Sequence, residues 1–518
     1  MTTPLHTLSF IQPNLYQDSV ALMRVAQRLI EMPGVVNATL QMGNPANKEI
    51  LQEAGLLTRE VQGAGPSDVM VVLQARSRDA AQAARAASKL ELAGQDPATP
   101  AGGGAAAAAI PLRSAGMGLA HMGQANIAQI SVPGAYAGAE ALKAVKLGLN
   151  VFLFSDNVPL AQEVAVKQEA LRRGLLVMGP DCGTAIIGGV PLGFANNLRR
   201  GSIGLVAASG TGLQEVTTQI HRMGGGVSHA VGTGGRDVYA KVGGATMLQG
   251  IALLAKDPAT KVIVIVSKPP APEVRDKVMA ALRSCGKPAV VLFLGSAPQA
   301  PQARDKAIHV VPTLVDCAAK ALHLAGLKRQ APAHYPIPAK PVFAAAQKFL
   351  RALYCGGSYA AEAQAIWAEA GLQVRSNAPL DEAMALPNPR AASIGHCALD
   401  LGDDAFTVGR PHPMIDQSAR IERLQREAAD PSVRVILLDV VIGWGAHADP
   451  AAELAVAVKQ AKRIAQKGKR HLAVIGFVCG TELDPQGLAD QEAKLRAAGM
   501  VLAGNSANAA WLAREWLR

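Results

Sequence analysis

The chain alternates short apolar runs with longer amphipathic stretches, and glycine-rich turns separate the two. The run 262–266 contains only Val and Ile, whereas the stretch 17–32 has apolar residues at helical spacing. Continuous apolar runs are typical of parallel strands that helices cover on both faces. The pattern therefore predicts an α/β protein built from parallel sheets.

The second half of the chain contains the same order of elements twice. In residues 201–326 a strand leads into the glycine turn 209–212, which opens a helix. Residues 349–516 repeat this order with the turn 355–358. Each copy continues through a second polar turn, a helix, an apolar strand, a basic turn, a further strand and a closing helix. We therefore expect two doubly wound, flavodoxin-like units related by a pseudo-twofold axis.

Alternating strand and helix patterns before the repeat predict two further domains. The predicted parts are a small N-terminal α/β domain over 1–91, a linker over 92–115 rich in Ala, Gly and Pro, a half-Rossmann domain over 116–200, and the two units over 201–330 and 345–518. A proline-rich connection, 331–341, joins the two units. The predicted fold class is thus α/β throughout.

Composition and charge narrow the function. Hydrophobic residues make up 49% of the chain but aromatic residues only 4%, and the six cysteines show no paired spacing. We therefore expect reduced thiols in a cytoplasmic protein, without a zinc site, a signal peptide or a membrane span. The net charge is +11, but basic residues occur singly or in pairs without interleaved aromatics. This favours attraction of small anionic substrates over binding of nucleic acid.

The strongest candidate site is the turn that opens the first repeated helix. Gly210 and Gly212 allow the backbone to approach an anion, and the hydroxyls of Ser209 and Thr211 can cap the helix or donate to phosphate. The free N–H groups and the positive end of a helix favour an anion at this point. An ordinary capped turn is the alternative. The equivalent turn of the second unit places Gly356, Gly357 and Ser358 in the same role.

A second group of candidates follows the next strand in each unit. Gly234, Gly235 and Arg236 form a turn in which Arg236 can clamp a carboxylate or phosphate, or simply pair with its neighbour. Asp400 and Gly402 form the corresponding turn of the second unit. Asp400, with Asp403 and Asp404, can bind Mg²⁺, orient a substrate amide, or only cap the turn that follows.

The turn that contains Gly443, Gly445 and His447 gives the last candidates. His447 lies near an expected helix start, which would lower its pKa and make it a neutral donor or proton carrier, although a lone histidine is more often a satisfied polar residue. His412 is a weaker candidate in a loop flanked by prolines. Cys182 has no readable histidine partner and is interpreted as structural.

Several of these motifs resemble the α subunit of succinyl-CoA synthetase. Its Gly-Pro-Asn-Cys turn and Ser-Gly-Thr helix start are similar to residues 179–182 and 209–211 here, and its Gly-x-Gly-Gly-Asp element is similar to 232–237. The second unit is similar to the carboxy-terminal domain of that enzyme's β subunit. The order and fusion of these parts, together with residues 13–23 and 155–160, resemble the FdrA family over the whole length.

The departures from succinyl-CoA synthetase point to a different reaction. Residues 5–90 lack its glycine-rich CoA loop, and no Gly-His-Ala-Gly phosphohistidine motif follows the strand 289–295. No segment is left for an ATP-grasp domain. We therefore expect no certain cofactor, no metal and no phosphohistidine relay, and CoA is a doubtful ligand.

The FdrA resemblance implies a subunit of an oxamate carbamoyltransferase. Such an enzyme phosphorolyses an N-carbamoyl acid such as oxalurate to oxamate and carbamoyl phosphate during allantoin breakdown. Phosphate or carbamoyl phosphate would be the bound substrate, and other carbamoyltransferase subunits would complete an oligomer. The proton for the amide leaving group would come from His447 or from a partner subunit. The alternatives are an acyl-CoA synthetase subunit and a non-catalytic scaffold.

Overall fold

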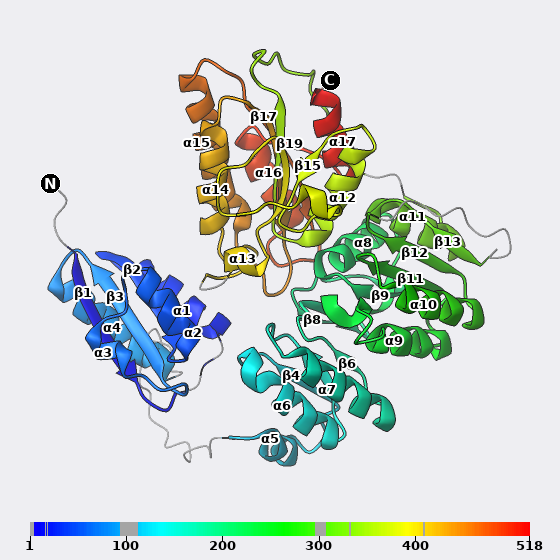
Figure 1. Ribbon diagram of the computed structural model, residues 1–518, viewed down its shortest axis with the longest axis horizontal. Helices are drawn as coiled ribbons and strands as arrows, with labels where there is room; N and C mark the ends of the chain where they lie inside the picture. The colour runs from blue at the N-terminus through cyan, green and yellow to red at the C-terminus, as the bar shows by residue number, and fades with distance from the viewer. Residues whose placement is uncertain are drawn as a thin grey trace. The chain divides into compact units, whose positions relative to one another are not determined.

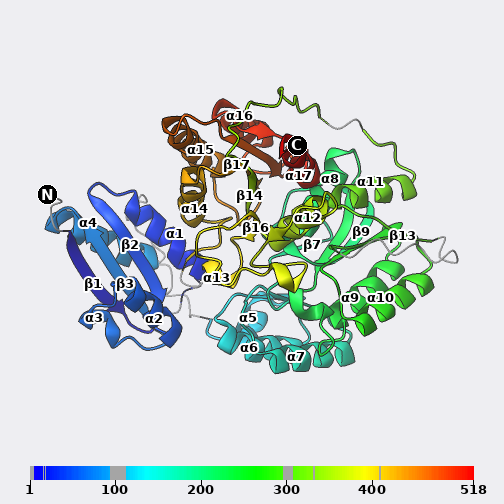
Figure 2. The same ribbon diagram turned by 45° about the horizontal axis from the view of Figure 1, so that its top comes forward.

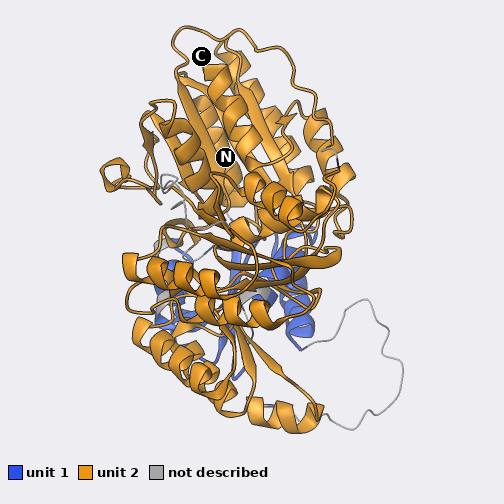
Figure 3. Cartoon of the chain, turned by 90° about the vertical axis from the view of Figure 1, so that its right-hand side faces the viewer, with its two compact units in different colours: residues 1–112, 408–411 blue, residues 113–407, 412–518 orange. Residues whose placement is uncertain are grey.

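The computed structural model describes residues 5–15, 17, 19–93, 112–295, 307–330, 333–407 and 410–517. The chain forms two compact units, which Figure 3 shows in different colours. Unit 1 comprises residues 1–112 and 408–411, and unit 2 comprises residues 113–407 and 412–518. Most of the predicted linker, residues 94–111, lies outside the described residues.

Unit 1 is a small α/β domain with a three-stranded antiparallel sheet of order β1-β3-β2. Its elements are β1 (His6–Gln12), α1 (Ser19–Ile30), β2 (Val35–Met42), α2 (Pro45–Glu53), α3 (Arg59–Gln62), β3 (Val69–Ala75) and α4 (Arg78–Leu92). Alternate residues of β3 serve two cores: Val69 and Val71 pack in one apolar cluster, and Met70 and Val72 in another. Helices therefore cover both faces of this sheet.

Unit 2 begins with a three-stranded parallel sheet of order β4-β5-β6 (Figure 1). Its elements are α5 (Ala115–Met122), β4 (Ile127–Ile130), α6 (Gly134–Lys146), β5 (Asn150–Leu153), α7 (Leu160–Arg173) and β6 (Val177–Met178). This is the predicted half of a doubly wound sheet, with β4 at its edge.

The first repeated unit contains a seven-stranded sheet of order β13-β12-β11-β9-β10-β7-β8. Its strands are β7 (Thr184–Ile187), β8 (Val190–Gly193), β9 (Arg200–Ala208), β10 (Val227–Gly232), β11 (Val262–Ser267), β12 (Ala289–Phe293) and β13 (Ile308–Val310). Its helices are α8 (Gly210–Arg222), η1 (Gly235–Val238), α9 (Ala245–Lys256), α10 (Pro272–Ser284) and α11 (Leu314–Leu324).

The second repeated unit contains a six-stranded parallel sheet of order β15-β16-β14-β17-β18-β19. Its strands are β14 (Phe349–Tyr354), β15 (Val374–Arg375), β16 (His396–Asp400), β17 (Val433–Val441), β18 (Ala473–Cys479) and β19 (Val501–Leu502). Its helices are α12 (Gly357–Ala368), η2 (Glu382–Met384), α13 (Asp404–Thr407), α14 (Ser418–Ala429), α15 (Pro450–Lys467), α16 (Leu488–Ala497) and α17 (Ser506–Leu517).

The two sheets share one topology. When the hairpin strands β7 and β8 and the edge strand β15 are left out, five strands remain in each unit, β9 to β13 and β14 with β16 to β19. Numbered along the chain, the five strands of each unit lie in the spatial order five, four, three, one, two. In both units a helix follows the first strand directly, namely α8 and α12. The prediction of two doubly wound parallel units within an α/β protein is therefore confirmed.

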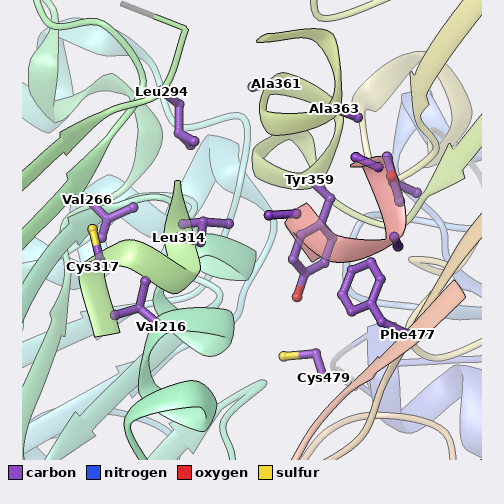
Figure 4. Close-up of a cluster of buried hydrophobic side chains, with 14 of the residues drawn as sticks. Val216, Val266, Leu294, Leu314, Cys317, Tyr359, Ala361, Ala363, Phe477 and Cys479 are labelled. Atoms are coloured by element: carbon purple, nitrogen blue, oxygen red, sulfur yellow. The ribbon is translucent and has the colours of Figure 1, made fainter. Parts of the chain in front are cut away.

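One apolar core runs through both repeated units. Figure 4 shows residues of this core from both units, among them Leu314 and Cys317 of α11 together with Tyr359 of α12 and Cys479 of β18. Apolar runs such as 262–266 are completely buried, as expected for parallel strands covered on both faces. None of the described helices is both long and apolar enough to cross a membrane.

Candidate functional site

Two helix N-termini meet where the repeated units face each other. Ser209 is the N-cap of α8, and its hydroxyl accepts a hydrogen bond from the Gly212 N–H at 3.0 Å. Gly356 is the N-cap of α12, and the hydroxyl of Ser358, two residues later, forms a hydrogen bond with the Ser209 hydroxyl. The structure thus brings together the two turns that the sequence placed in separate units. Figure 2 shows the two helices side by side.

The backbones approach closely because a glycine stands at the contact. A Cβ atom added at Gly356 would overlap the side chain of Thr211, which is itself buried. At Gly210 an added Cβ would lie 3.7 Å from the Thr184 hydroxyl, which is ordinary van der Waals contact. The steric need for glycine is therefore strong at Gly356 and weak at Gly210.

Two charged groups flank the second turn. A Cβ atom at Gly357 would lie 2.8 Å from the Asp400 carboxylate and 3.6 Å from the Lys268 ammonium. Asp400 ends β16 and accepts a hydrogen bond from the Gly402 N–H at 3.0 Å, whereas Lys268 follows β11 and is exposed. Burial raises the pKa of Asp400 to about 6, although Lys268 and the Gly402 N–H oppose the shift. The site therefore offers two sets of helix N–H groups, one ammonium group and one titratable carboxyl group.

A further carboxyl group lies on the turn after β6. Asp181 is exposed at the surface, yet partial desolvation by the surrounding loops, together with the charges of Asp156 and Asp404, raises its pKa to about 7. Lys268 opposes this shift, so it faces both Asp181 and Asp400. A carboxyl group that titrates near neutrality has the properties of a general acid.

Gly234, Gly235 and Arg236 form the neighbouring turn of the first unit. Gly234 packs against the Pro180 carbonyl in a left-handed conformation with φ +78°. Arg236 pairs with Glu163 at 3.0 Å and donates to the Val158 carbonyl at 2.7 Å. These contacts hold Arg236 against the half-Rossmann domain, so its predicted role as an anion clamp stays a prediction.

Asp403 and Asp404, in the acidic turn of the second unit, make different contacts. The Asp403 carboxylate accepts the Ala405 N–H at 3.0 Å and so caps the turn, whereas Asp404 faces Asp181. His412 lies against Gly402, and burial lowers the pKa of this histidine to about 4. Among the described residues, His, Cys, Asp and Glu form no group of three or more that could hold a metal ion.

The turn of Gly443, Gly445 and His447 follows β17 and packs against the segment after β8. Gly443 and Gly445 pack against Ala195 and Phe194 of the segment that follows β8, and the adjoining helix α15 is capped by Asp449. The expected lowering of the His447 pKa is wrong: its pKa is raised, chiefly because of its hydrogen bond with Glu453. A nearby carboxylate stabilises the imidazolium more than the helix end disfavours it.

The buried cysteines are poor nucleophiles. Cys182 donates to the Thr184 carbonyl, and burial raises the pKa of this thiol to about 12. The Cys355 thiol donates to Asp439, and burial next to that carboxylate raises its pKa well above the usual value. The interpretation of Cys182 as structural agrees with this environment.

Sequence reasoning missed Lys268, Asp156 and Asp181. All three follow the carboxyl ends of strands, where open α/β sheets bind ligands. Their position directly after apolar runs is a sequence signal for residues at the ligand-binding end of a parallel sheet. Their convergence from separate elements required the structure.

Family models match three parts of the chain. They are "AllF, heavy metal-associated domain" over residues 5–109, "CoA binding domain" over residues 199–295 and "CoA-ligase" over residues 353–515. The CoA-binding model thus falls on the first repeated unit rather than on the half-Rossmann domain. The two repeated units thus match the CoA-binding and CoA-ligase domain models, one in each unit.

Relatives narrow this assignment. YahF of Escherichia coli (strain K12) is 42% identical over 514 residues, which cover 98% of each chain, and this chain therefore belongs to the same family as YahF. The succinate–CoA ligase [ADP-forming] subunit alpha of Aquifex aeolicus is 31% identical over 153 residues, 28% of this chain and 48% of that protein. The ADP-forming sulfoacetate-CoA ligase subunit SqwL of an Acholeplasma species is 31% identical over 133 residues, 24% of this chain and 44% of that protein. The chain thus spans about half the length of these two ligase subunits.

One solved structure similar to this chain is the apo form of a dinucleotide-forming acetyl-coenzyme A synthetase from Ca. Korarchaeum cryptofilum. The two chains are 15% identical, with a TM-score of 0.32, and the match covers 76% of this chain and 84% of that one.

Proposed function

We propose that this chain is a subunit of an acid–CoA ligase-like enzyme that binds a phosphoryl or acyl phosphate group between the N-termini of α8 and α12. The observation that carries the proposal is the direct contact between the Ser209 and Ser358 hydroxyls. Two helix N-termini and two hydroxyls then point at one place, which favours an oxyanion with several negatively charged oxygens.

The neighbouring charges have defined parts in this proposal. Lys268 supplies a positive charge beside Gly357, and the backbone N–H groups of both turns stabilise charge that develops on the transferred group. Asp181, which titrates near neutrality, supplies or takes up the proton of the group that leaves or attacks. His447 has no part in this proposal, because its imidazole pairs with Glu453 of α15.

Carbamoyl transfer of the FdrA type is the second candidate function. The match of residues 5–109 to an AllF domain supports it, as does the absence of any histidine from residues 289–308. Packing in the half-Rossmann domain supports it as well. A Cβ atom at Gly134 would collide with the Asn157 and Asp156 carbonyls, so the loops after β4 and β5 touch at the carboxyl end of this sheet. That is the end at which doubly wound sheets bind dinucleotides. In this candidate, phosphate attacks the carbamoyl carbon of an N-carbamoyl acid such as oxalurate, and partner subunits complete the active site.

Calorimetric titration separates the candidates. Inorganic phosphate and CoA are titrated separately into the purified chain, and then into the chain carrying Gly357→Val, whose side chain would press on Asp400 and Lys268. Gly63→Ala is the control, because a Cβ there meets nothing within 4 Å. Phosphate binding that Gly357→Val abolishes and Gly63→Ala preserves supports the shared site. CoA binding favours the ligase and phosphate alone favours carbamoyl transfer. Binding of neither ligand would overturn both in favour of a scaffold.

An activity assay then tests the chemistry. The chain is purified with the partners that accompany it in its own host, and a panel of N-carbamoyl acids is tested for phosphate-dependent release of carbamoyl phosphate. Loss of one oxyanion donor typically slows such reactions by about a hundredfold to a thousandfold. Carbamoyl transfer is wrong if every acid is inert while CoA and an acyl phosphate react.

A further inference from the structure

Two buried glutamates occupy equivalent places in the repeated units. Glu215 comes five residues after Gly210 in α8, and Glu362 comes five residues after Gly357 in α12. Their exposed fractions are 0% and 2%. Buried carboxyl groups are costly when charged, so a matched pair of them at an interface needs a physical explanation.

Each glutamate binds the start of the closing helix of the other unit. The Ser506 N–H, at the start of α17, donates to Glu215 Oε1 at 3.3 Å. The Leu314 N–H, at the start of α11, donates to Glu362 Oε1 at 2.7 Å. The Ser506 hydroxyl also donates to Glu362 Oε2. Ser506 therefore joins the two carboxyl groups across the interface.

The surroundings disfavour negative charge on this pair. The charged and titratable groups that face the two carboxyls are Arg222 of α8, Asp316 and Cys317 of α11, Cys479 of β18, Tyr354 of β14 and Tyr359 of α12. Arg222 is shared with Tyr335, Glu492 and the Val478 carbonyl. Glu215 Oε2 is buried without a hydrogen-bond partner among the described residues. Burial is the first cause that raises the pKa of both glutamates to about 7.

We propose that Glu215, Ser506 and Glu362 form a proton-holding tie between the two repeated units. The two carboxyl groups hold protons while the units are joined, and they lose these protons to solvent as the pH rises above neutrality. A protonated carboxyl keeps an acceptor oxygen for the helix N–H and avoids two negative charges in one buried cluster. The tie goes beyond the proposed function and does not rest on it, because it concerns how the halves of unit 2 stay together.

The sign of the pH effect is fixed by the direction of the pKa changes. Each carboxyl has a higher pKa in the folded chain, about 7, than its ordinary value of 4.5. Its contribution to stability is therefore complete below about pH 4.5 and is lost as the pH rises through 7. Between pH 6 and 8 the unfolding equilibrium constant should rise about tenfold for each carboxyl.

The test is urea unfolding at pH 6 and pH 8 of the wild-type chain, Glu215→Gln, Glu362→Gln and the double variant. Glutamine keeps the acceptor oxygen but cannot lose a proton. The rise in the unfolding equilibrium constant between pH 6 and pH 8 should therefore be about tenfold smaller in each single variant than in wild type, and about a hundredfold smaller in the double variant. Glu273→Gln, at an exposed glutamate in the first turn of α10, is the matched control and should leave the change as in wild type. Equal pH dependence in all five proteins would overturn the proposal.

A measurement on the wild-type chain covers the case in which the glutamine variants do not fold. Infrared difference spectra of protein labelled with ¹³C-glutamate distinguish protonated glutamic acid from aspartic acid. We expect a protonated glutamic acid band at pH 6 that disappears by pH 8.5. Absence of that band at pH 6 contradicts the tie.

Discussion

The two repeated units solve the same folding problem with different chemistry. Counted back five residues from the N-caps Ser209 and Gly356, the first strand of the first unit has Gly204 where that of the second has Arg351. Leu254 and Thr260 fill the space beside Gly204, whereas Arg351 pairs with Glu427 at 2.8 Å. An apolar contact and a buried ion cluster thus occupy equivalent places, so the topology does not depend on either.

The helix starts differ in the same way. In the first unit Ser209 caps its own helix, whereas in the second Gly356 provides no side chain and Ser358 reaches across to Ser209. The first unit thus provides the capping side chain, and the absence of a side chain at Gly356 leaves space for Thr211. Asp400 adds a further difference, because Gly232 occupies the equivalent strand end in the first unit. At this position the second unit therefore has a titratable carboxyl group and the first unit has none.

Arg351→Met should have the largest effect, because it breaks the buried ion cluster of the second unit. We expect a loss of about 3 kcal/mol of unfolding free energy, since Glu427 would stay buried with only part of its partners. Glu427 keeps Arg423 at 2.7 Å, which holds the loss near the lower end of the usual range. The measurement is urea unfolding. The control is Arg426→Met, at an exposed arginine of α14, the helix that contains Glu427. It should cost less than about 0.5 kcal/mol of unfolding free energy. If the two variants lose the same stability, the ion cluster does not stabilise the second unit.

Gly356→Ala compared with Gly210→Ala tests where the close approach matters. The added methyl at position 356 must displace Thr211, which should cost about 2 kcal/mol. The methyl at position 210 meets only the Thr184 hydroxyl at 3.7 Å and should be neutral or stabilise the helix slightly. Thermal unfolding of the pair gives the comparison. A larger loss from Gly210→Ala would show that the first turn, not the second, sets the spacing of the helices.

Much of the fold followed from the sequence because the apolar runs and their order determine a parallel sheet. The repeat predicted two equivalent units, and the half-Rossmann strands near 127–130 and 150–153 lie where the pattern placed them. The hairpin of β7 and β8 was missed, although Gly188-Gly189 between two apolar runs is a hairpin signal.

The site was only partly predictable for a physical reason. The glycine turns at 209–212 and 356–358 have local signatures, and the structure brings them together. Asp181, Lys268 and the pair of Glu215 and Glu362 depend on contacts between distant segments, which periodicity cannot reveal. The predicted lowering of the His447 pKa is wrong because Glu453, the fourth residue of the next helix, forms a hydrogen bond with the imidazole.

Ser209→Ala should have a smaller effect, of about 1 kcal/mol, because it removes a helix cap. Ser358→Ala should cost about 0.5 kcal/mol, since it removes one hydrogen bond and leaves the cap of α8 intact. Chemical denaturation of both single variants and the double variant gives the coupling between the hydroxyls. A coupling energy of zero would mean that the contact does not hold the two helices together.

The smallest effect concerns Asp400 and is measured as the affinity of the site for an anion. Asp400 is charged above its pKa of about 6, and a carboxylate beside Gly357 repels an anion bound at the helix N-termini. Sulfate is the suitable probe because its charge stays constant over this pH range. The wild-type chain should bind sulfate more tightly as the pH falls from 7.5 to 5, because Asp400 gains a proton. Asp400→Asn should already bind about fivefold more tightly at pH 7.5, which corresponds to about 1 kcal/mol of removed repulsion.

The pH profile of the Asp400→Asn variant completes this test. Its affinity should change less between pH 7.5 and 5, and the remaining change should come from Asp181, which titrates near 7. Asp403→Asn is the control, because Asp403 caps its own turn through the Ala405 N–H. The same affinity in wild type and Asp400→Asn at every pH would place the bound anion away from Gly357. The first unit alone would then hold the anion, and the second would serve only to close the site.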